Sequence, residues 1–343
     1  MRFLILAMTT LSLATASDFS ALTTTIDGVR VVRLADAVRR IEVSVAVTLG
    51  NNAYEMKVNG KNVFWQPAET LAAWRAQPRL AGNPFMAPWA NRLDQDAFYA
   101  NGKRYLLNDS LGNLRRDANK LPIHGLLLFW EHWEVAELGA DAQSAWVTSR
   151  LDFARYPDLM AQFPFAHLIE MTYRLSGGAL EVATRLENRS AEPMPVAIGF
   201  HPYFQVHDAP RENWKVRIGA REQVVLSSLL VPTGERKPLT LPDPVVLGES
   251  SLDDVFTHLV RDEAGRAKFS LEGARERVSV LFGPKYTVGI VYAPPTGRFV
   301  AIEPMTALTN GLNLHHAGRY PELQWIAPGA DWRESFWVIP EGF

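Results

Sequence analysis

The sequence contains no cysteine among its 343 residues. This absence excludes a disulfide framework, a cysteine-ligated zinc or iron–sulfur site and a thiol nucleophile. An excess of positive charge is absent as well, because 35 Lys and Arg residues are balanced by 37 Asp and Glu residues. Proteins that bind nucleic acid, or that lie on a membrane through a polybasic surface, need such an excess, so we expect neither partner.

Several motifs of nucleotide-binding, metal-dependent and hydrolytic enzymes are also missing. The chain has no G-x-x-x-x-G-K-[ST] loop, no G-x-G-x-x-G after a strand, no H-E-x-x-H and no G-x-S-x-G. The neighbours His315 and His316 would point to opposite faces of an extended segment, which makes them a poor metal chelate. We expect this pair on the surface or in a loop, and we expect no cofactor and no metal.

Aromatic residues, in contrast, are abundant. The chain has 10 Trp, 9 Tyr and 17 Phe, and 47% of its residues are hydrophobic. Such a content is typical of a globular protein with a large core, or of a site in which a ring-shaped ligand lies. The 22 Pro and 23 Gly are scattered along the chain, without a linker, repeat or charge block. We therefore expect a single domain over residues 17–343.

The first 16 residues have the pattern of a secretory signal peptide. Arg2 supplies the positive region, residues 3–14 form a short apolar run, and Ala14-Thr15-Ala16 matches an A-x-A cleavage site. The run is too short to span a bilayer, and no later stretch reaches about 18 uncharged apolar residues. We expect an exported protein, periplasmic or extracellular, with no membrane contact after cleavage. The alternative interpretation of this segment is an N-terminal strand or core segment.

Period-two patterning dominates the rest of the chain and predicts many short strands. Apolar residues alternate with polar ones over residues 41–49, 54–58, 169–175 and 180–186. Residues 278–282 and 286–292 are expected to form a strand pair around Gly283-Pro284. Hairpin turns are predicted at Asn59-Gly60, Asn101-Gly102 and Ser176-Gly177-Gly178.

Helical patterning is scarce, and only residues 69–75 predict a short helix. Many short strands separated by turns are typical of an all-β sandwich or barrel. The sequence therefore predicts the all-β class.

Two titratable residues end predicted buried strands. Glu303 closes the apolar run 299–302, and Pro304 then stops the strand. A carboxylate at this point is either a general base in a cleft or a rim glutamate bonded to loop amides. His201 follows the apolar run 195–198, and it either transfers a proton near neutral pH or has a structural role.

Polar residues in three other segments allow two interpretations each. His124, followed by a glycine that permits close approach of a ligand, has the same character as His201. Arg92 ends a Pro-rich turn and is either a fork donor to paired hydroxyls or a surface charge. Asp253 and Asp254 precede an apolar pair, and they are either a loop cap and a hydroxyl acceptor or plain loop acids.

Taken in order, these segments resemble the aldose 1-epimerase (galactose mutarotase) family over about residues 40–340. Their joint order and spacing carry the resemblance. The matching motifs are Pro88-Trp89-Ala90-Asn91-Arg92, Asn101-Gly102-Lys103, His124-Gly125, Phe200-His201-Pro202-Tyr203-Phe204, Asp253-Asp254-Val255-Phe256 and Ile302-Glu303-Pro304-Met305-Thr306. The resemblance implies a large antiparallel β-sandwich of galactose-mutarotase-like type with a sugar in an open cleft.

The resemblance also implies a reaction and the residues that carry it. Glu303 would take the proton from the C1 hydroxyl of an aldose, and His201 would protonate the ring oxygen. The ring would open to the aldehyde and close again on the other face. Substrate binding would fall to Arg92, His124, Asp253, Asn91 and Tyr203, and a stacking wall for the sugar ring to Trp89, Tyr203 and Phe204.

The run Leu126-Leu127-Leu128 departs from the family pattern and offers no phosphate clamp, which favours an unphosphorylated sugar as the small-molecule substrate. Three alternatives stay open. The first is a carbohydrate-binding β-sandwich without turnover, and the second is a hexose-6-phosphate mutarotase. The third is a glycoside hydrolase or lyase, which would need a second carboxyl group from Asp253 or Asp254 opposite Glu303.

Overall fold

The computed structural model describes residues 18–248 and 250–343, so the expected signal peptide, residues 1–16, lies outside the described residues. Within these ranges no helix is long and apolar enough to cross a membrane. The described α-helices are short and are α1 (Leu71–Ala76), α2 (Pro157–Gln162) and α3 (Gly311–His316).

Strands form two large antiparallel sheets and a third, N-terminal one. The N-terminal sheet has the order β1 (Phe19–Ile26), β2 (Val29–Asp36), β3 (Ile41–Ala46), β4 (Asn52–Val58) and β5 (Lys61–Asn62). The nine-stranded sheet has the order β19 (Val245–Val246), β16 (Lys215–Arg217), β21 (Ala267–Glu272), β22 (Arg277–Phe282), β26 (Asp331–Glu341), β12 (Ala179–Asn188), β11 (His167–Ser176), β10 (Ser144–Asp152) and β9 (Glu134–Ala140).

The eight-stranded sheet positions most of the residues singled out above. Its order is β18 (Pro232–Pro238), β17 (Ala220–Leu226), β20 (Leu252–Leu259), β23 (Val288–Ala293), β24 (Val300–Met305), β14 (Gly199–Phe200) and β6 (Phe85–Met86), with β15 (Tyr203–Phe204) also paired to β24. Two small sheets complete the fold, β13 (Met194–Val196) with β25 (Gln324–Ile326), and β7 (Ala97–Ala100) with β8 (Lys103–Leu106). The predicted all-β antiparallel sandwich is confirmed.

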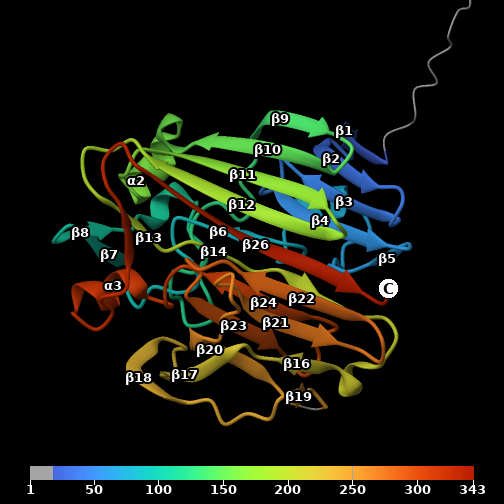
Figure 1. Cartoon of the computed structure of the whole chain (residues 1–343). Coiled ribbons are helices and arrows are strands. Elements are labelled where there is room, and N and C mark those ends of the chain that lie inside the picture. Colours follow the sequence, from blue (N-terminus) through green and yellow to red (C-terminus); the bar gives the residue numbers. More distant parts are fainter. Residues whose placement is uncertain (1–17, 249) are drawn as a thin grey trace, which may run out of the picture.

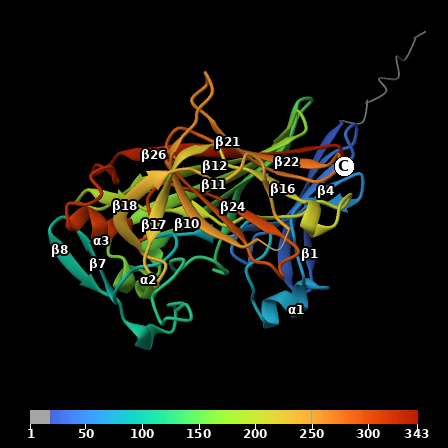
Figure 2. The same ribbon diagram turned by 90° about the horizontal axis from the view of Figure 1, so that it is seen from below.

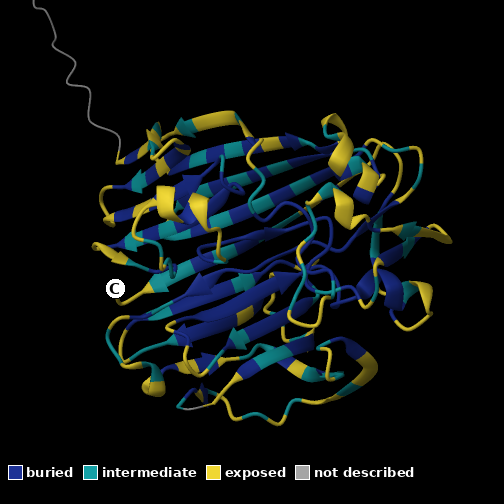
Figure 3. Ribbon diagram, turned by 180° about the vertical axis from the view of Figure 1, so that it is seen from behind, coloured by how far each residue is buried: buried dark blue, intermediate teal, exposed yellow. Residues whose placement is uncertain are grey.

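The core lies between the large sheets because one face of each strand is apolar. Along β12, buried and half-buried residues alternate strictly, and Leu180, Val182 and Leu186 face inward. Phe336 of β26 contacts Phe200 of the eight-stranded sheet, with ring centroids 4.9 Å apart. Figure 3 shows the strands as buried or half-buried along most of their length, with exposure concentrated in the loops.

The last strand, β26, lies inside the nine-stranded sheet and not at its edge. It pairs with β12 on one side and with β22 on the other, so Val338 is opposite both Leu180 and Val280 (Figure 1). Its neighbours are therefore separated from it by about 140 and 50 residues of chain. The two parts of the nine-stranded sheet are joined only when this final segment has paired with both β12 and β22.

The three predicted hairpins are confirmed. Val58 pairs with Lys61, Ala100 with Lys103, and Ser176 with Ala179. Their turn residues Asn59, Asn101 and Gly177 all have positive φ, as tight hairpin turns require.

The expected pairing of 278–282 with 286–292 is wrong. β22 pairs with β21 and β26, whereas β23 pairs with β20 and β24 in the other sheet. Gly283-Pro284 thus belongs to a crossover between sheets. Both strands are buried on both faces, so their period-two pattern carries no information about the partner.

The predicted helix over 69–75 is confirmed as α1, whose N-cap Thr70 accepts a hydrogen bond from the Ala73 N–H with its side chain. Figure 2 shows α1, α2 and the β7–β8 hairpin on the side of the molecule away from β26. His315 and His316 lie at the end of helix α3, and not on an extended segment.

Candidate active site

One face of the eight-stranded sheet gathers the polar residues of the candidate site. The β15–β24, β23–β24 and β20–β23 registers place Tyr203, Ala301, Tyr292 and Asp253 in one row. Glu303 lies two residues beyond Ala301 on β24, and therefore on the same face. Three of the strands that carry these residues, β20, β23 and β24, are neighbours in the lower half of Figure 1.

Glu303 and His201 oppose each other within this face. His201 lies between β14 and β15, where its backbone N–H donates to the backbone carbonyl of Pro84 at 2.9 Å. Its Nε2 is 3.3 Å from Glu303 Oε1, and both side chains are almost fully buried. The ring of Tyr203 stacks on the imidazole with centroids 4.5 Å apart, and its hydroxyl lies 3.4 Å from the same Nε2. The pair therefore occupies a fixed geometry in which a proton can pass between the two groups.

Burial governs the protonation of this pair. Loss of solvation, and then the charge of Asp253, raise the pKa of Glu303 well above its ordinary value, and Arg92 opposes this effect. Burial lowers the pKa of His201 to about 3, with a further contribution from Arg92. Both groups thus disfavour charge, so the pair favours the state in which Glu303 carries a proton and His201 is neutral.

His124 completes an imidazole pair from a second loop. Its ring meets that of His201 edge to face, with centroids 5.4 Å apart. The backbone N–H of His124 donates to the backbone carbonyl of Asn91 at 2.9 Å, and His124 has a φ of +63°. Gly125 follows with a φ of +64°, and a Cβ atom there would lie 2.2 Å from the Ala87 carbonyl oxygen. The loop can approach this closely only because residue 125 is glycine.

Arg92 is held by two side chains beside the buried pair. Its Nε donates to Asp117 Oδ2 at 2.7 Å, and its Nη1 donates to Asn91 Oδ1 at 3.0 Å. The other oxygen of Asp117 accepts hydrogen bonds from two backbone N–H groups at 2.9 Å, those of Asn119 and Leu121. These bonds, with the Arg92 charge, lower the pKa of Asp117 in spite of its burial. The guanidinium is thereby fixed in orientation.

Sequence reasoning did not find Asp117. The turn that it begins, Asp117 to Lys120, marks only a loop. Asp117 matters for the site because it binds Arg92, which is 25 positions earlier in the chain.

The structure places Asp253 and Asp254 on opposite faces of β20. Asp254 accepts a hydrogen bond from Gln223 Nε2 at 2.5 Å, away from Glu303. Asp253 lies across from Tyr292, and its pKa is raised by burial, with Arg92 acting in the other direction. Of the two acids, Asp253 is therefore the one that shares a face with the buried pair.

Several polar atoms of the site are buried without a hydrogen-bond partner among the described residues. They are Oε2 of Glu303 and the Nδ1 atoms of His201 and His124. Such atoms are costly unless a ligand or water satisfies them. Three of them lie close together, which makes this cluster the candidate site.

The expected stacking wall is wrong in two of its three members. Trp89 is 1% exposed and Phe204 is fully buried, so both belong to the core. Tyr203 instead packs with Phe299 and with the partly exposed rings of Trp65 and Tyr292. The centroid of Trp65 is 4.6 Å from that of Phe299 and 5.8 Å from that of Tyr203.

The sequence pattern did not point to Trp65 or Tyr292 as site residues. The pairing of β23 with β24 places Tyr292 in the site, and the sequence alone does not specify this register. Trp65 follows the short strand β5 and reaches the site only through the fold.

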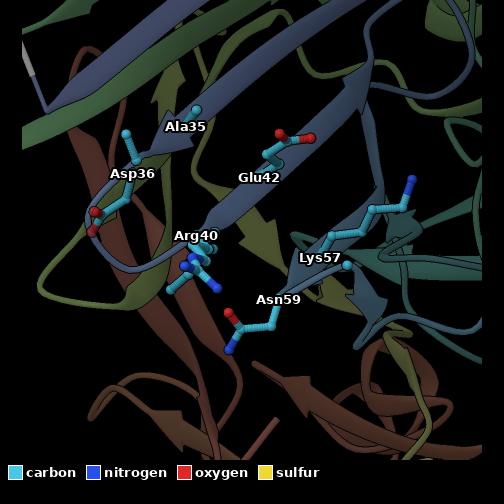
Figure 4. A pocket seen from close by; sticks show the side chains of 9 residues that line it. Ala35, Asp36, Arg40, Glu42, Lys57 and Asn59 are labelled. Carbon is cyan, nitrogen blue, oxygen red and sulfur yellow. The ribbon is translucent and has the colours of Figure 1, made fainter. Parts of the chain in front are cut away.

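Other candidates lie apart from this site. A hollow of about 400 Å³ between Asp36 and Asn59, at the end of the N-terminal sheet, contains none of the candidate residues (Figure 4). His315 Nδ1 lies 2.9 Å from the Tyr320 carbonyl oxygen, and His316 stacks on Tyr99. In the described part of the chain, no group of three or more His, Cys, Asp or Glu residues could hold a metal ion.

The fold and the site together define an antiparallel β-sandwich protein with a buried carboxylate–imidazole pair beside other polar side chains. Residues 31–337 match the family model described as aldose 1-epimerase. The chain belongs to the aldose 1-epimerase family.

Solved structures share the fold along nearly the whole chain. A galactose mutarotase-like protein from Clostridium acetobutylicum is 21% identical, with a TM-score of 0.84 over 95% of this chain and 99% of that one. A galactose 1-epimerase from Lactobacillus acidophilus is 14% identical, with a TM-score of 0.73 over 96% of this chain and 100% of that one. A putative aldose 1-epimerase from Escherichia coli is 15% identical, with a TM-score of 0.65 over 95% and 100%.

Proposed function

We propose that this protein interconverts the α and β anomers of an unphosphorylated aldose by acid–base ring opening and closing. The observation that carries the proposal is the 3.3 Å approach of Glu303 Oε1 to His201 Nε2 in a buried site with unsatisfied polar atoms. Ring opening needs one group to take a proton and one to give a proton, and no redox step. Family membership supports an epimerase reaction of this type.

The steps can be assigned to the pair with the proton count unchanged. With the pair's proton on His201, the Glu303 carboxylate takes the proton of the C1 hydroxyl while His201 gives a proton to the ring oxygen. The bond between C1 and the ring oxygen breaks, and the carbonyl forms at C1. After rotation about the bond between C1 and C2, the transfers run in reverse and give the other anomer. Both groups then return to their first state.

Binding of the sugar falls, in this proposal, to the residues around the pair. The Arg92 charge acts on both His124 and Asp253, and these three side chains would bind hydroxyls. Asn91 orients Arg92 through its Oδ1, and Tyr203 orients His201 through ring stacking. Leu127 and Leu128 are buried in the core, which leaves no phosphate clamp after His124-Gly125 and supports an unphosphorylated substrate.

Two of the alternatives lose support from the geometry. A glycoside hydrolase would need two carboxyl groups flanking the scissile bond, whereas the group opposite Glu303 is the imidazole of His201. A binding module without turnover would need neither member of a proton-transfer pair.

Polarimetry on freshly dissolved α-glucose and α-galactose tests the proposal. Added protein should speed the relaxation of at least one aldose. Glu303→Gln should reduce the rate by about 10²–10⁴-fold, because it removes the proton acceptor. Glu235→Gln, at an exposed site on β18, is the matched control and should keep full activity. An unchanged relaxation rate across a panel of aldoses would refute the epimerase proposal, and an active Glu303→Gln would refute the role of Glu303.

We also propose that residues 1–16 direct export and are removed after Ala16. N-terminal sequencing of the protein recovered from outside the cytoplasm should then start at Ser17. Recovery of the intact chain inside the cytoplasm would contradict this.

A further inference from the structure

Arg211 makes an unusual set of contacts close to the candidate active site. It begins the short 3₁₀ helix Arg211–Asn213, in the connection between β15 and β16. Its guanidinium donates to four backbone carbonyls, from Nη1 to Gly248 at 2.8 Å, and from Nη2 to Ser250 at 3.3 Å, Ala293 at 3.3 Å and Pro294 at 2.9 Å. Burial lowers the pKa of this guanidinium, and no carboxylate of the described residues offsets the lost solvation.

The four carbonyls belong to the ends of two neighbouring strands. Gly248 and Ser250 precede β20, whereas Ala293 and Pro294 lie at the end of β23. The two strands are antiparallel neighbours in Figure 1, and Leu252 of β20 pairs with Ala293. One guanidinium therefore joins the start of β20 to the end of β23. Because the guanidinium is planar and rigid, it fixes several acceptors relative to one another.

The adjacent pair of residues in this ladder carries two side chains of the candidate active site. Asp253 pairs with Tyr292, directly next to the pair that Arg211 holds. The carboxylate of Asp254 is held by Gln223, but among the described residues no hydrogen bond holds that of Asp253. The position of the Asp253 carboxylate therefore depends on the backbone of β20.

We infer that Arg211 is a positioning residue, which holds the paired ends of β20 and β23 so that Asp253 and Tyr292 keep their places beside Glu303. The inference rests on the proposed function for the role of these side chains in sugar binding. The positioning itself can be tested without turnover.

Arg261 supplies a matched control within the same sheet. It also donates to backbone carbonyls, those of Gly265, Gly283 and Tyr286, and burial lowers its pKa as well. Two of these carbonyls precede the start of β23, at the end opposite to the one that Arg211 binds. Loss of Arg261 should therefore reduce stability without displacing Asp253.

Mutarotation kinetics test the inference on the active protein. Arg211→Gln should lower kcat/KM about 10-fold, mainly through KM, because a displaced binding group weakens the complex with the sugar. Arg211→Lys keeps the charge without the planar fork and should show a smaller loss of the same kind. In an Asp253→Asn background, Arg211→Gln should have no further effect on kcat/KM.

Arg261→Gln should keep the kcat/KM of the wild type. Circular dichroism shows which variants fold, and Arg211→Lys decides if Arg211→Gln does not. Equal losses in the Arg211 and Arg261 variants would overturn the inference and leave the proposed function standing. A loss from Arg211→Gln that adds in full to that from Asp253→Asn would do the same.

The titration of Glu303 tests the positioning without any turnover. The titratable and charged groups that act on Glu303 or contact it are Asp253, Arg92, His201, Tyr203 and Tyr292. The Asp253 charge raises the pKa of Glu303, so displacement of Asp253 should lower this pKa. Direct loss of the Arg211 charge would act in the opposite direction, because a cation favours the carboxylate.

Carbon-13 NMR of labelled glutamate side chains gives this pKa in each variant. Arg211→Gln should lower the pKa of Glu303 in the same direction as Asp253→Asn does, and Arg261→Gln should leave it unchanged. An unchanged or raised pKa in Arg211→Gln would overturn the inference. If the protein turns over no aldose, the proposed function fails, and this titration still decides whether Arg211 positions Asp253.

Discussion

Glu303 and His201 differ from free carboxyl and imidazole groups because both side chains are almost fully buried. The pair shares a single proton in a buried site. Proton transfer to a substrate requires that the pair keeps this proton. A second proton is added only near pH 3, because burial lowers the pKa of His201 to about that value. The shared proton is lost only above the raised pKa of Glu303.

The pH profile of kcat/KM should therefore differ from that of an ordinary histidine enzyme. We expect no inflection from His201 near pH 6.5, because burial lowers the pKa of this imidazole to about 3. On the alkaline side the rate should fall when Glu303 loses its proton. Initial rates measured by polarimetry across this range give the profile, after subtraction of the uncatalysed rate. An acidic limb centred at 6.5 would show that His201 is solvated.

Asp117 is a positioning residue for Arg92. Asp117→Asn weakens the 2.7 Å bond to Arg92 Nε, and we expect kcat/KM to fall about 10- to 100-fold as the guanidinium becomes misplaced. In an Arg92→Ala background the same change should have no further effect on kcat/KM. Asp96→Asn, which alters an exposed pair with Arg116, is the control and should be nearly neutral. A full effect of Asp117→Asn without Arg92 would show a merely structural role.

At the scale of elements, the loop that carries His124 depends on one glycine. Gly125 and Gly102 both have positive φ, but a Cβ at Gly102 meets nothing within 4 Å, whereas at Gly125 it would lie 2.2 Å from the Ala87 oxygen. Gly102→Ala should cost about 1–2 kcal/mol of unfolding free energy. Gly125→Ala should cost more and should also displace His124 and reduce activity. Urea unfolding of the two variants gives the comparison, and equal losses would contradict it.

Local patterns in the sequence predict the elements better than their partners. The Asn-Gly turns specify hairpins because the register follows from a two-residue loop. The sequence around Gly283-Pro284 allows either a hairpin or a crossover, and the structure has the crossover. Pairing between sheets depends on contacts that no local pattern contains.

The candidate site, like the fold, contains features that local sequence patterns predict and features that depend on distant contacts. Glu303 and His201 are recognisable because a titratable group follows a buried apolar run in each case. The expectation that Pro304 stops the strand after Glu303 is wrong, because β24 continues through both residues to Met305 and pairs with β23 along this length. Asp117 and Trp65 are not, since each acts through a residue that is far away in the sequence. Trp89 and Phe204 were wrongly expected to face a sugar, because aromatic content alone cannot separate a core ring from a binding ring.

At the scale of the whole molecule, buried neutral histidines make the fold sensitive to acid. His167, outside the site, stacks on Phe153 with centroids 4.3 Å apart, and burial lowers its pKa to about 4. Between the unfolded value near 6.5 and this folded value, the unfolded chain binds more protons. Stability therefore falls as the pH falls from 6.5 to 4, by up to ~3 kcal/mol for this residue.

Urea unfolding at pH 7 and pH 4.5 measures this effect. His167→Gln cannot titrate, so it should lose less unfolding free energy between the two pH values than the wild type does. Equal losses in both proteins would assign the acid sensitivity to other groups.

The central place of β26 has a consequence for how the chain is made. Ribosomes synthesise the nine-stranded sheet from β9 onward, yet the strand that joins its two parts is the last one to emerge. Until residues 331–341 leave the exit tunnel, β12 and β22 present unpaired edges, which are prone to intermolecular pairing. A truncation that removes residues 331–341 should therefore aggregate, not fold partially.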